Sequence, residues 1–105
     1  MKRAIAAALL LAAAPAWADG PIAVTLKNHK FTPSEIHVKA NTPTVLSISN
    51  QDATAEEFDS TALKVEKVIA GNSQGTVRIS PLQPGHYDFI GEYHEETAKG
   101  QVIAE

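Results

Sequence analysis

The sequence predicts an all-β sandwich of about seven short strands. Apolar and polar residues alternate with a period of two in several segments, most clearly over residues 35–39. Proline, glycine and asparagine separate these segments at short intervals, which is typical of the tight turns in a sandwich. No internal repeat or low-complexity run follows the N-terminal region, so one small domain is expected.

The strands follow one another with few residues between them. Pro33 and Pro43 interrupt ladder formation, and Pro84-Gly85 forms a further turn. One connection does not fit a strand: residues 54–57 have the Thr-x-x-Glu form of a capping box, which predicts a short helical turn between residues 51 and 62. A second helical turn is expected over residues 94–98. The expected strands cover residues 22–26, 35–39, 44–50, 63–69, 76–79, 86–90 and 101–104.

The N-terminus has the three parts of a secretory signal peptide. A charged start is followed by an apolar run over residues 4–14 and by small residues ending at Ala18. That run is shorter than the ~20 residues that span a bilayer, which argues against a membrane anchor. We therefore expect a signal peptide over residues 1–18, cleavage before Asp19, and a periplasmic domain over residues 19–105.

Composition narrows the function classes. The chain has no cysteine, so it has neither a disulfide nor a thiolate ligand for a metal. After removal of Lys2 and Arg3 the domain keeps 7 of 9 basic residues against 12 acidic ones, a net charge of −5. This balance argues against nucleic acid and anionic membranes as partners, and it is compatible with metal cations or a basic protein.

His94 is the histidine most suited to binding a metal. His29 lies in a basic turn, and His37 and His86 lie on the outward faces of predicted strands, so these three are expected to be ordinary surface residues. Imidazole with carboxylates is a normal ligand set for divalent first-row metals. His94 has three acidic neighbours in sequence, which are Glu92, Glu95 and Glu96.

Motifs along nearly the whole domain resemble the cupredoxins. In the first half these are Phe31-x-Pro33-x-x-Ile36-x-Val38-x-Ala40 and Val45-x-x-Ile48-x-Asn50-Gln51-Asp52. In the second half these are Val68-Ile69-Ala70-Gly71, Pro81-Leu82-x-Pro84-Gly85-x-Tyr87-x-Phe89 and the ending from His94 to Gly100. The resemblance implies a Greek-key β-sandwich in which two ligand-bearing loops meet at one end.

The resemblance also indicates which of the family's metal ligands this chain lacks. Blue-copper cupredoxins place a first His at the position of Glu56, a Cys at Gly91, a second His at His94 and a Met near Ala98 or Lys99. Only His94 matches the family's ligands. A type 1 blue copper site needs the thiolate, so electron transfer through such a site is excluded.

The resemblance implies instead a site of imidazole and carboxylates. The candidate ligands are His94, then Glu57 and Glu66, then Glu56, Asp59 and Glu92. Such ligands suit Cu(II), iron, Mn(II) or Zn(II) better than Cu(I). The segment over residues 57–69 resembles the EfeO type of cupredoxin-like proteins that accompany bacterial iron-permease uptake. This implies a periplasmic accessory that binds copper or iron during ferrous-iron import, with an inner-membrane iron permease or another uptake component as partner.

Other functions stay open at this stage. The acidic residues could be ordinary solubilising charges on a scaffold whose site has degenerated. A metal-free module could dock onto a permease or a periplasmic partner through residues 51–62. An enzyme is not expected, because a single small site without cysteine stores no electrons. The sequence leaves open whether the chain acts alone or as a homodimer.

Overall fold

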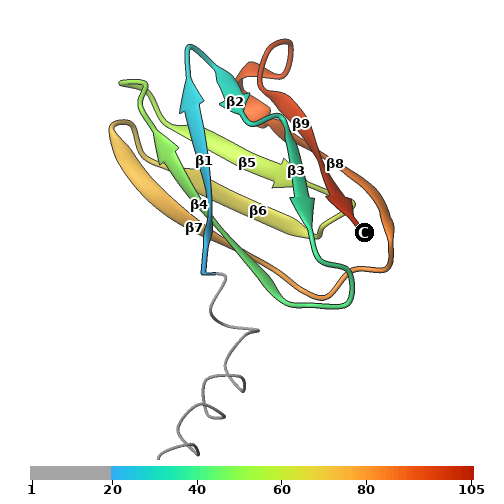
Figure 1. The fold of residues 1–105 in the computed structure, drawn as a ribbon. Helices are drawn as coiled ribbons and strands as arrows, with labels where there is room; N and C mark the ends of the chain where they lie inside the picture. The colour runs from blue at the N-terminus through green and yellow to red at the C-terminus, as the bar shows by residue number, and fades with distance from the viewer. Residues whose placement is uncertain (1–19) are drawn as a thin grey trace, which may run out of the picture.

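The structure, a computed structural model that describes residues 20–105, consists of two β-sheets packed face to face (Figure 1). The predicted signal peptide lies outside the described residues. The first sheet has the order β2-β1-β4-β7 and the second has the order β3-β9-β8-β5-β6. β1 pairs with β4, and β3 with β9, in parallel; the other pairings are antiparallel. The all-β sandwich predicted from the sequence is confirmed.

The described residues form nine strands rather than the expected seven or so. The first sheet contains β1 (Ile22–Lys27), β2 (Lys30–Thr32), β4 (Thr44–Asn50) and β7 (Ser73–Ile79). The second contains β3 (Glu35–Val38), β5 (Glu56–Ser60), β6 (Val65–Ile69), β8 (Gly85–Gly91) and β9 (Lys99–Ala104). Two of these strands were not expected from the sequence: β2, which has only three residues, and β5.

Strand β5 replaces the helical turn that the sequence predicted between residues 51 and 62, so that prediction was wrong. Glu56, Phe58 and Ser60 are buried on one face of β5, and Glu57 and Asp59 are half-buried on the other. The strand pairs with both β6 and β8. Ladder hydrogen bonds on both sides and complete burial of Phe58 therefore outweigh the local capping-box motif.

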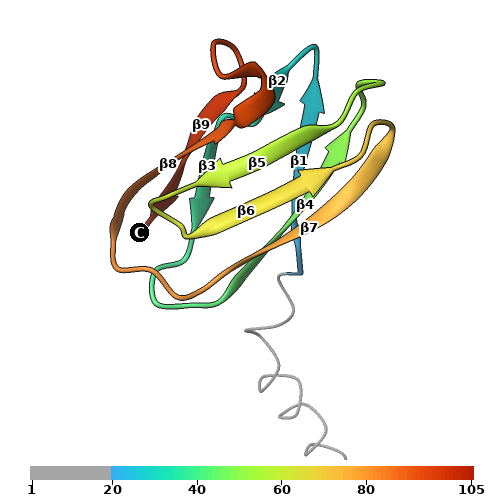
Figure 2. The same ribbon diagram turned by 180° about the vertical axis from the view of Figure 1, so that it is seen from behind.

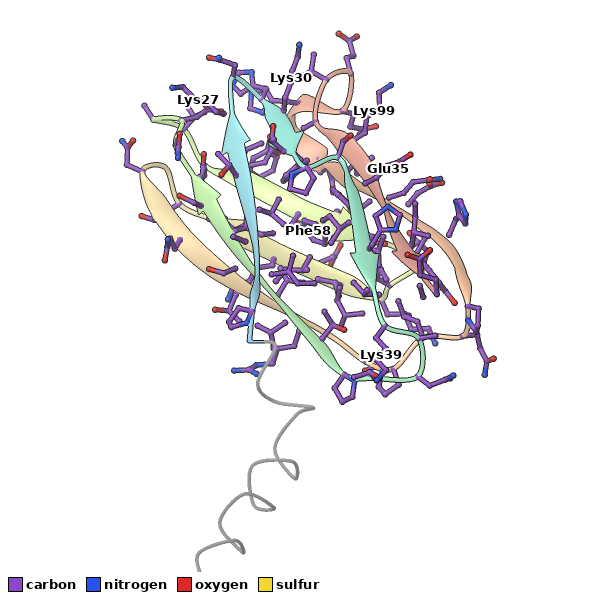
Figure 3. All side chains as sticks on the ribbon, viewed as in Figure 1. Lys27, Lys30, Glu35, Lys39, Phe58 and Lys99 are labelled. Carbon is purple, nitrogen blue, oxygen red and sulfur yellow. The ribbon has the colours of Figure 1, made fainter. Side chains whose placement is uncertain are left out.

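The core lies between the sheets, and three aromatic rings fill its centre. Phe58 stacks on Phe89 with ring centroids 4.7 Å apart, and Phe31 meets both rings edge-on. Figure 3 shows Phe58 between the two sheets and the labelled lysines at the rim of the sandwich. These aromatic contacts anchor β5 against β2 and β8, and the position of β5 fixes the candidate site described below.

The helical content of residues 20–105 is one short 3₁₀ helix, Glu92–His94, which follows β8. It begins two residues before the helical turn expected over residues 94–98. None of the helical structure in this described part of the chain is long and apolar enough to cross a membrane.

Candidate metal centre

Two connections lie at one end of the sandwich, and one of them carries the candidate ligands Glu92 and His94. The other four candidates lie on β5 and β6. The turn between β1 and β2 and the loop between β8 and β9 both lie at this end in the two opposite views (Figures 1 and 2). The imidazole rings of His29 and His94 join them, stacked with centroids 3.5 Å apart and planes inclined by 11°. The amide of Gly91 donates to the carbonyl of Ala98 at 2.8 Å and closes the second loop at its base.

Strand β5 sends two adjacent glutamates to opposite sides of its sheet. Side chains alternate along a strand, so Glu56 points into the sandwich and Glu57 points out. The Glu56 side chain is only 2% exposed. The alternation of β5 therefore creates two separate acidic environments from one dipeptide.

The inner environment is a carboxylate–imidazole pair. Nδ1 of His94 lies 2.6 Å from Oε2 of Glu56. The other carboxylate oxygen, Oε1, accepts from the amides of Tyr93 at 2.8 Å and Glu57 at 3.1 Å. A charged carboxylate only accepts hydrogen bonds, so Nδ1 of His94 is the donor when Glu56 carries its charge. Three donors thus satisfy the buried carboxylate, as a buried charge requires.

A further carboxylate positions the His29 ring. Asp52 accepts from the backbone amides of Asn28 at 2.8 Å and His29 at 3.0 Å. Hydrogen bonding to the His29 amide is the main reason that the pKa of Asp52 is lowered. Asp52 itself is held because its amide donates to the buried side chain of Asn50. The β1–β2 turn is therefore fixed where His29 can stack on His94.

The outer environment is a cluster of carboxylates, which we call the outer cluster: Glu57, Asp59, Glu66 and Glu92. Single carboxylate oxygens of Glu57, Glu66 and Glu92 all lie within 4.8 Å of one another. Glu66 on β6 is the direct cross-strand partner of Asp59 on β5. No lysine or arginine in the described part of the chain forms an ion pair with these four residues.

The close approach of these carboxylates raises the pKa of Glu92. Hydrogen bonding to Asp59 and then the negative charge of Glu57 raise the pKa of Glu92 from its ordinary value of 4.5 to about 7. At neutral pH the cluster therefore holds a proton part of the time. A cation of charge two would relieve the same repulsion.

The structure groups the candidate ligands differently from the expected site of His94, Glu57 and Glu66. The partner of His94 is Glu56, whereas Glu57 and Glu66 join Glu92. The expectation that His29 is an ordinary surface residue was wrong, because its ring stacks on His94. The basic residues around His29 argued against a metal ligand there, and no signal in the sequence indicated the contact with His94.

The residues at the cupredoxin ligand positions do not fit a copper ion. Glu56 and His94 are already bonded to each other, and Ala98 is fully buried without a ligand atom. A Cβ atom at Gly91 would lie 2.7 Å from Cδ of Glu56 and 2.7 Å from Cβ of Ala98. The space of a cysteine side chain is therefore filled by the Glu56 carboxyl group.

Comparison with known proteins agrees with this architecture. Among solved structures, a reduced Cu(I) form of an amicyanin variant is 20% identical, with a TM-score of 0.67 over 83% of this chain and 84% of that one. The metal-binding domain of the Cu(I)-exporting P-type ATPase CopA of Streptococcus pneumoniae, solved with Cu(I), is 14% identical, with a TM-score of 0.68 over 81% of this chain and 84% of that one. At these identities the likeness shows the fold.

Two sequence comparisons extend this result. An uncharacterized protein of Rickettsia prowazekii (strain Madrid E) is 38% identical over 82 residues, which are 78% of this chain and 66% of that protein. The match thus spans slightly less than two thirds of the relative's length. A family model described as a cupredoxin-like domain matches residues 3–104. The chain belongs to the family of cupredoxin-like domains.

Proposed function

We propose that this protein is a periplasmic metal-binding module and that the outer cluster holds the ion. The observation that carries the proposal is the approach of single oxygens of three carboxylates to within 4.8 Å of one another, with no ion pair to a basic side chain among residues 20–105. Carboxylates this close repel one another unless a proton or a cation lies between them. The copper-binding structural neighbours support a metal-binding role for the fold in general.

The donor set indicates the class of metal. Carboxylate oxygens are hard ligands that favour iron, Mn(II) or Cu(II) over Cu(I). Within this class we favour iron, because the segment over residues 57–69 resembles the EfeO type that accompanies iron-permease uptake. The proposed role is therefore an accessory that binds iron, or copper, during ferrous-iron import and passes it to an inner-membrane permease.

Calorimetric titration of the mature domain tests the metal site. Fe(II) under anaerobic conditions and Cu(II) are titrated into wild type, Glu57→Gln and Glu66→Gln. Each variant removes one charged ligand, and we expect affinity to fall by at least about tenfold, since the loss of outer-shell partners alone costs that much. The matched control is Glu96→Gln, which removes an exposed acid outside the cluster. Equal affinity in all four proteins would contradict the proposal.

A second candidate function is a metal-free docking module, and one observation favours it. Val68 and Tyr93 are both 53% exposed, and they border the outer cluster as the partner of Glu57 in β6 and the neighbour of Glu92. An apolar rim around an acidic patch suits a basic protein surface. The test measures binding of the domain to an iron permease in proteoliposomes with a chelator present. Binding that is unchanged in Glu57→Gln would favour this function over metal delivery.

A further inference from the structure

We propose that the Glu56–His94 hydrogen bond occupies the metal position of this fold and acts as a structural lock that excludes a metal ion. Both residues stand where the family carries ligands, yet they bind each other at 2.6 Å across 38 residues of sequence. The bond ties β5 to the loop between β8 and β9. A metal ion would make the same connection in a copper-binding relative, so here a hydrogen bond takes its place.

Hydrogen bonding occupies three of the about four acceptor sites of the Glu56 carboxylate. Oε1 accepts from two backbone amides, and Oε2 accepts from the imidazole. A metal ion held between Glu56 and Nδ1 of His94 would have to break the hydrogen bond between them. Breaking it would take one donor from a buried carboxylate, which is costly, so the closed arrangement is favoured over an open one.

Packing closes the same position from the other side. The carboxyl group of Glu56 fills the space that a side chain at Gly91 would need. The Cβ atom of Ala98, at the other end of the β8–β9 loop, borders the same space, and Ala98 is fully buried. A cysteine side chain at position 91 would therefore require the Glu56 carboxyl group or Ala98 to move.

The His29 ring adds a third contact to the lock. It covers one face of the His94 imidazole at a centroid separation of 3.5 Å, and its own backbone is held by Asp52. The His94 side chain consequently keeps only 28% exposure. Three segments of the chain are thus connected at this end of the sandwich: the β1–β2 turn around His29, the stretch from Asp52 to Glu56, and the loop around His94.

Cu(II) binding and thermal unfolding of His94→Ala test the lock. We expect the Kd for Cu(II) to stay within about twofold of wild type, because the ion binds elsewhere. We expect Tm to fall by about 10–20 °C, because the variant removes the imidazole partner of the buried Glu56 carboxylate and leaves it only two backbone donors. A Kd weakened tenfold with unchanged Tm would overturn the inference. So would a nitrogen coupling in the Cu(II) paramagnetic resonance spectrum of wild type that disappears in His94→Ala.

Two further variants keep the test decisive if His94→Ala fails to fold. Glu56→Gln keeps the shape of the side chain, and we expect it to leave the Kd for Cu(II) unchanged while lowering Tm. Gly91→Ala adds only the Cβ atom, and we expect a lower Tm from the overlap with Glu56 and Ala98; wild-type stability of Gly91→Ala would overturn the filled-space argument. If no metal binds to the wild type at all, the proposed function fails, but the Tm changes still decide whether the lock exists.

Discussion

Glu56 and Glu57 are consecutive glutamates with opposite chemical situations. Glu56 is buried, and three hydrogen-bond donors satisfy its charge. Glu57 faces outward with the carboxylates of Glu66 and Glu92 close by, and it forms no ion pair within residues 20–105. The number of neighbouring carboxylates therefore does not by itself identify a metal site. What distinguishes the two residues is whether the protein itself already supplies the positive partners.

The largest test of this comparison is the stability of Glu56→Ala against Glu57→Ala. Removing Glu56 leaves His94 and two backbone amides without their acceptor, and we expect a loss of about 3–5 kcal/mol. Removing Glu57 relieves repulsion at the surface, and we expect a change within about 0.5 kcal/mol. Urea denaturation of metal-free protein measures both. Similar losses in the two variants would show that the two environments are not distinct.

Asp52→Ala sharpens the description of the inner environment. The Asp52 carboxylate accepts two backbone amides of the β1–β2 turn, and its loss should cost about 1.5–3 kcal/mol, as for hydrogen bonds to charged groups. Hydrogen exchange at the amides of Asn28 and His29 should accelerate at the same time. Asp88→Ala, which removes an exposed carboxylate from another strand, is the control. Unchanged exchange at both amides would mean that Asp52 does not hold the turn.

Glu66→Gln tests the opposite sign in the outer cluster. Glu66 faces Asp59 directly across the β5–β6 ladder, and like charges in such pairs are destabilising. We expect the metal-free variant to be more stable than wild type by about 0.2–1 kcal/mol, with the gain shrinking at high salt. The gain should also vanish when wild type is saturated with metal. A destabilised metal-free variant would rule out repulsion as the dominant interaction of Glu66.

The pH dependence of stability gives the smallest expected effect. The pKa of Glu92 rises from 4.5 to about 7 on folding, so between these values the folded state binds more protons than the unfolded state. The stability that folding gains from the protonated form of Glu92 is therefore fully present below pH 4.5 and is lost as pH rises through about 7. Metal-free wild type should lose more stability than Glu92→Gln between pH 5 and 8, both values chosen to bracket that pKa. If the stability of wild type and of Glu92→Gln changed equally with pH, the repulsion would not act on Glu92.

The fold was predictable because its signals are regular. Alternation in β3 and β4, together with the proline and glycine turns, is sufficient to indicate a sandwich. Strand β5 was not predictable in the same way, because residues 54–57 carry a genuine capping motif. Pairing with β6 and β8 decides the conformation there, and such long-range pairing leaves no local trace in the sequence.

The sequence was sufficient to indicate which side chains come close together, but not how they are grouped, and metal binding by them stays a prediction. All six residues expected as ligands belong to the inner pair or the outer cluster, which are the two acidic environments at this site. Their grouping depends on which way β5 turns its side chains, and an expected helical turn gives no such alternation. Once β5 is known to be a strand, Glu56 and Glu57 must face opposite sides. The role of His29 depends on loop packing, which no periodicity records.

The alternation of β5 also constrains how this protein can change during evolution. A shift of one residue in the pairing of β5 would move Glu57 into the position beside His94 and expose Glu56, while Phe58 would leave the core. An insertion or deletion within residues 56–60 would thus alter folding and metal chemistry together. We expect the dipeptide to tolerate substitution at either residue more readily than any change of length in this strand.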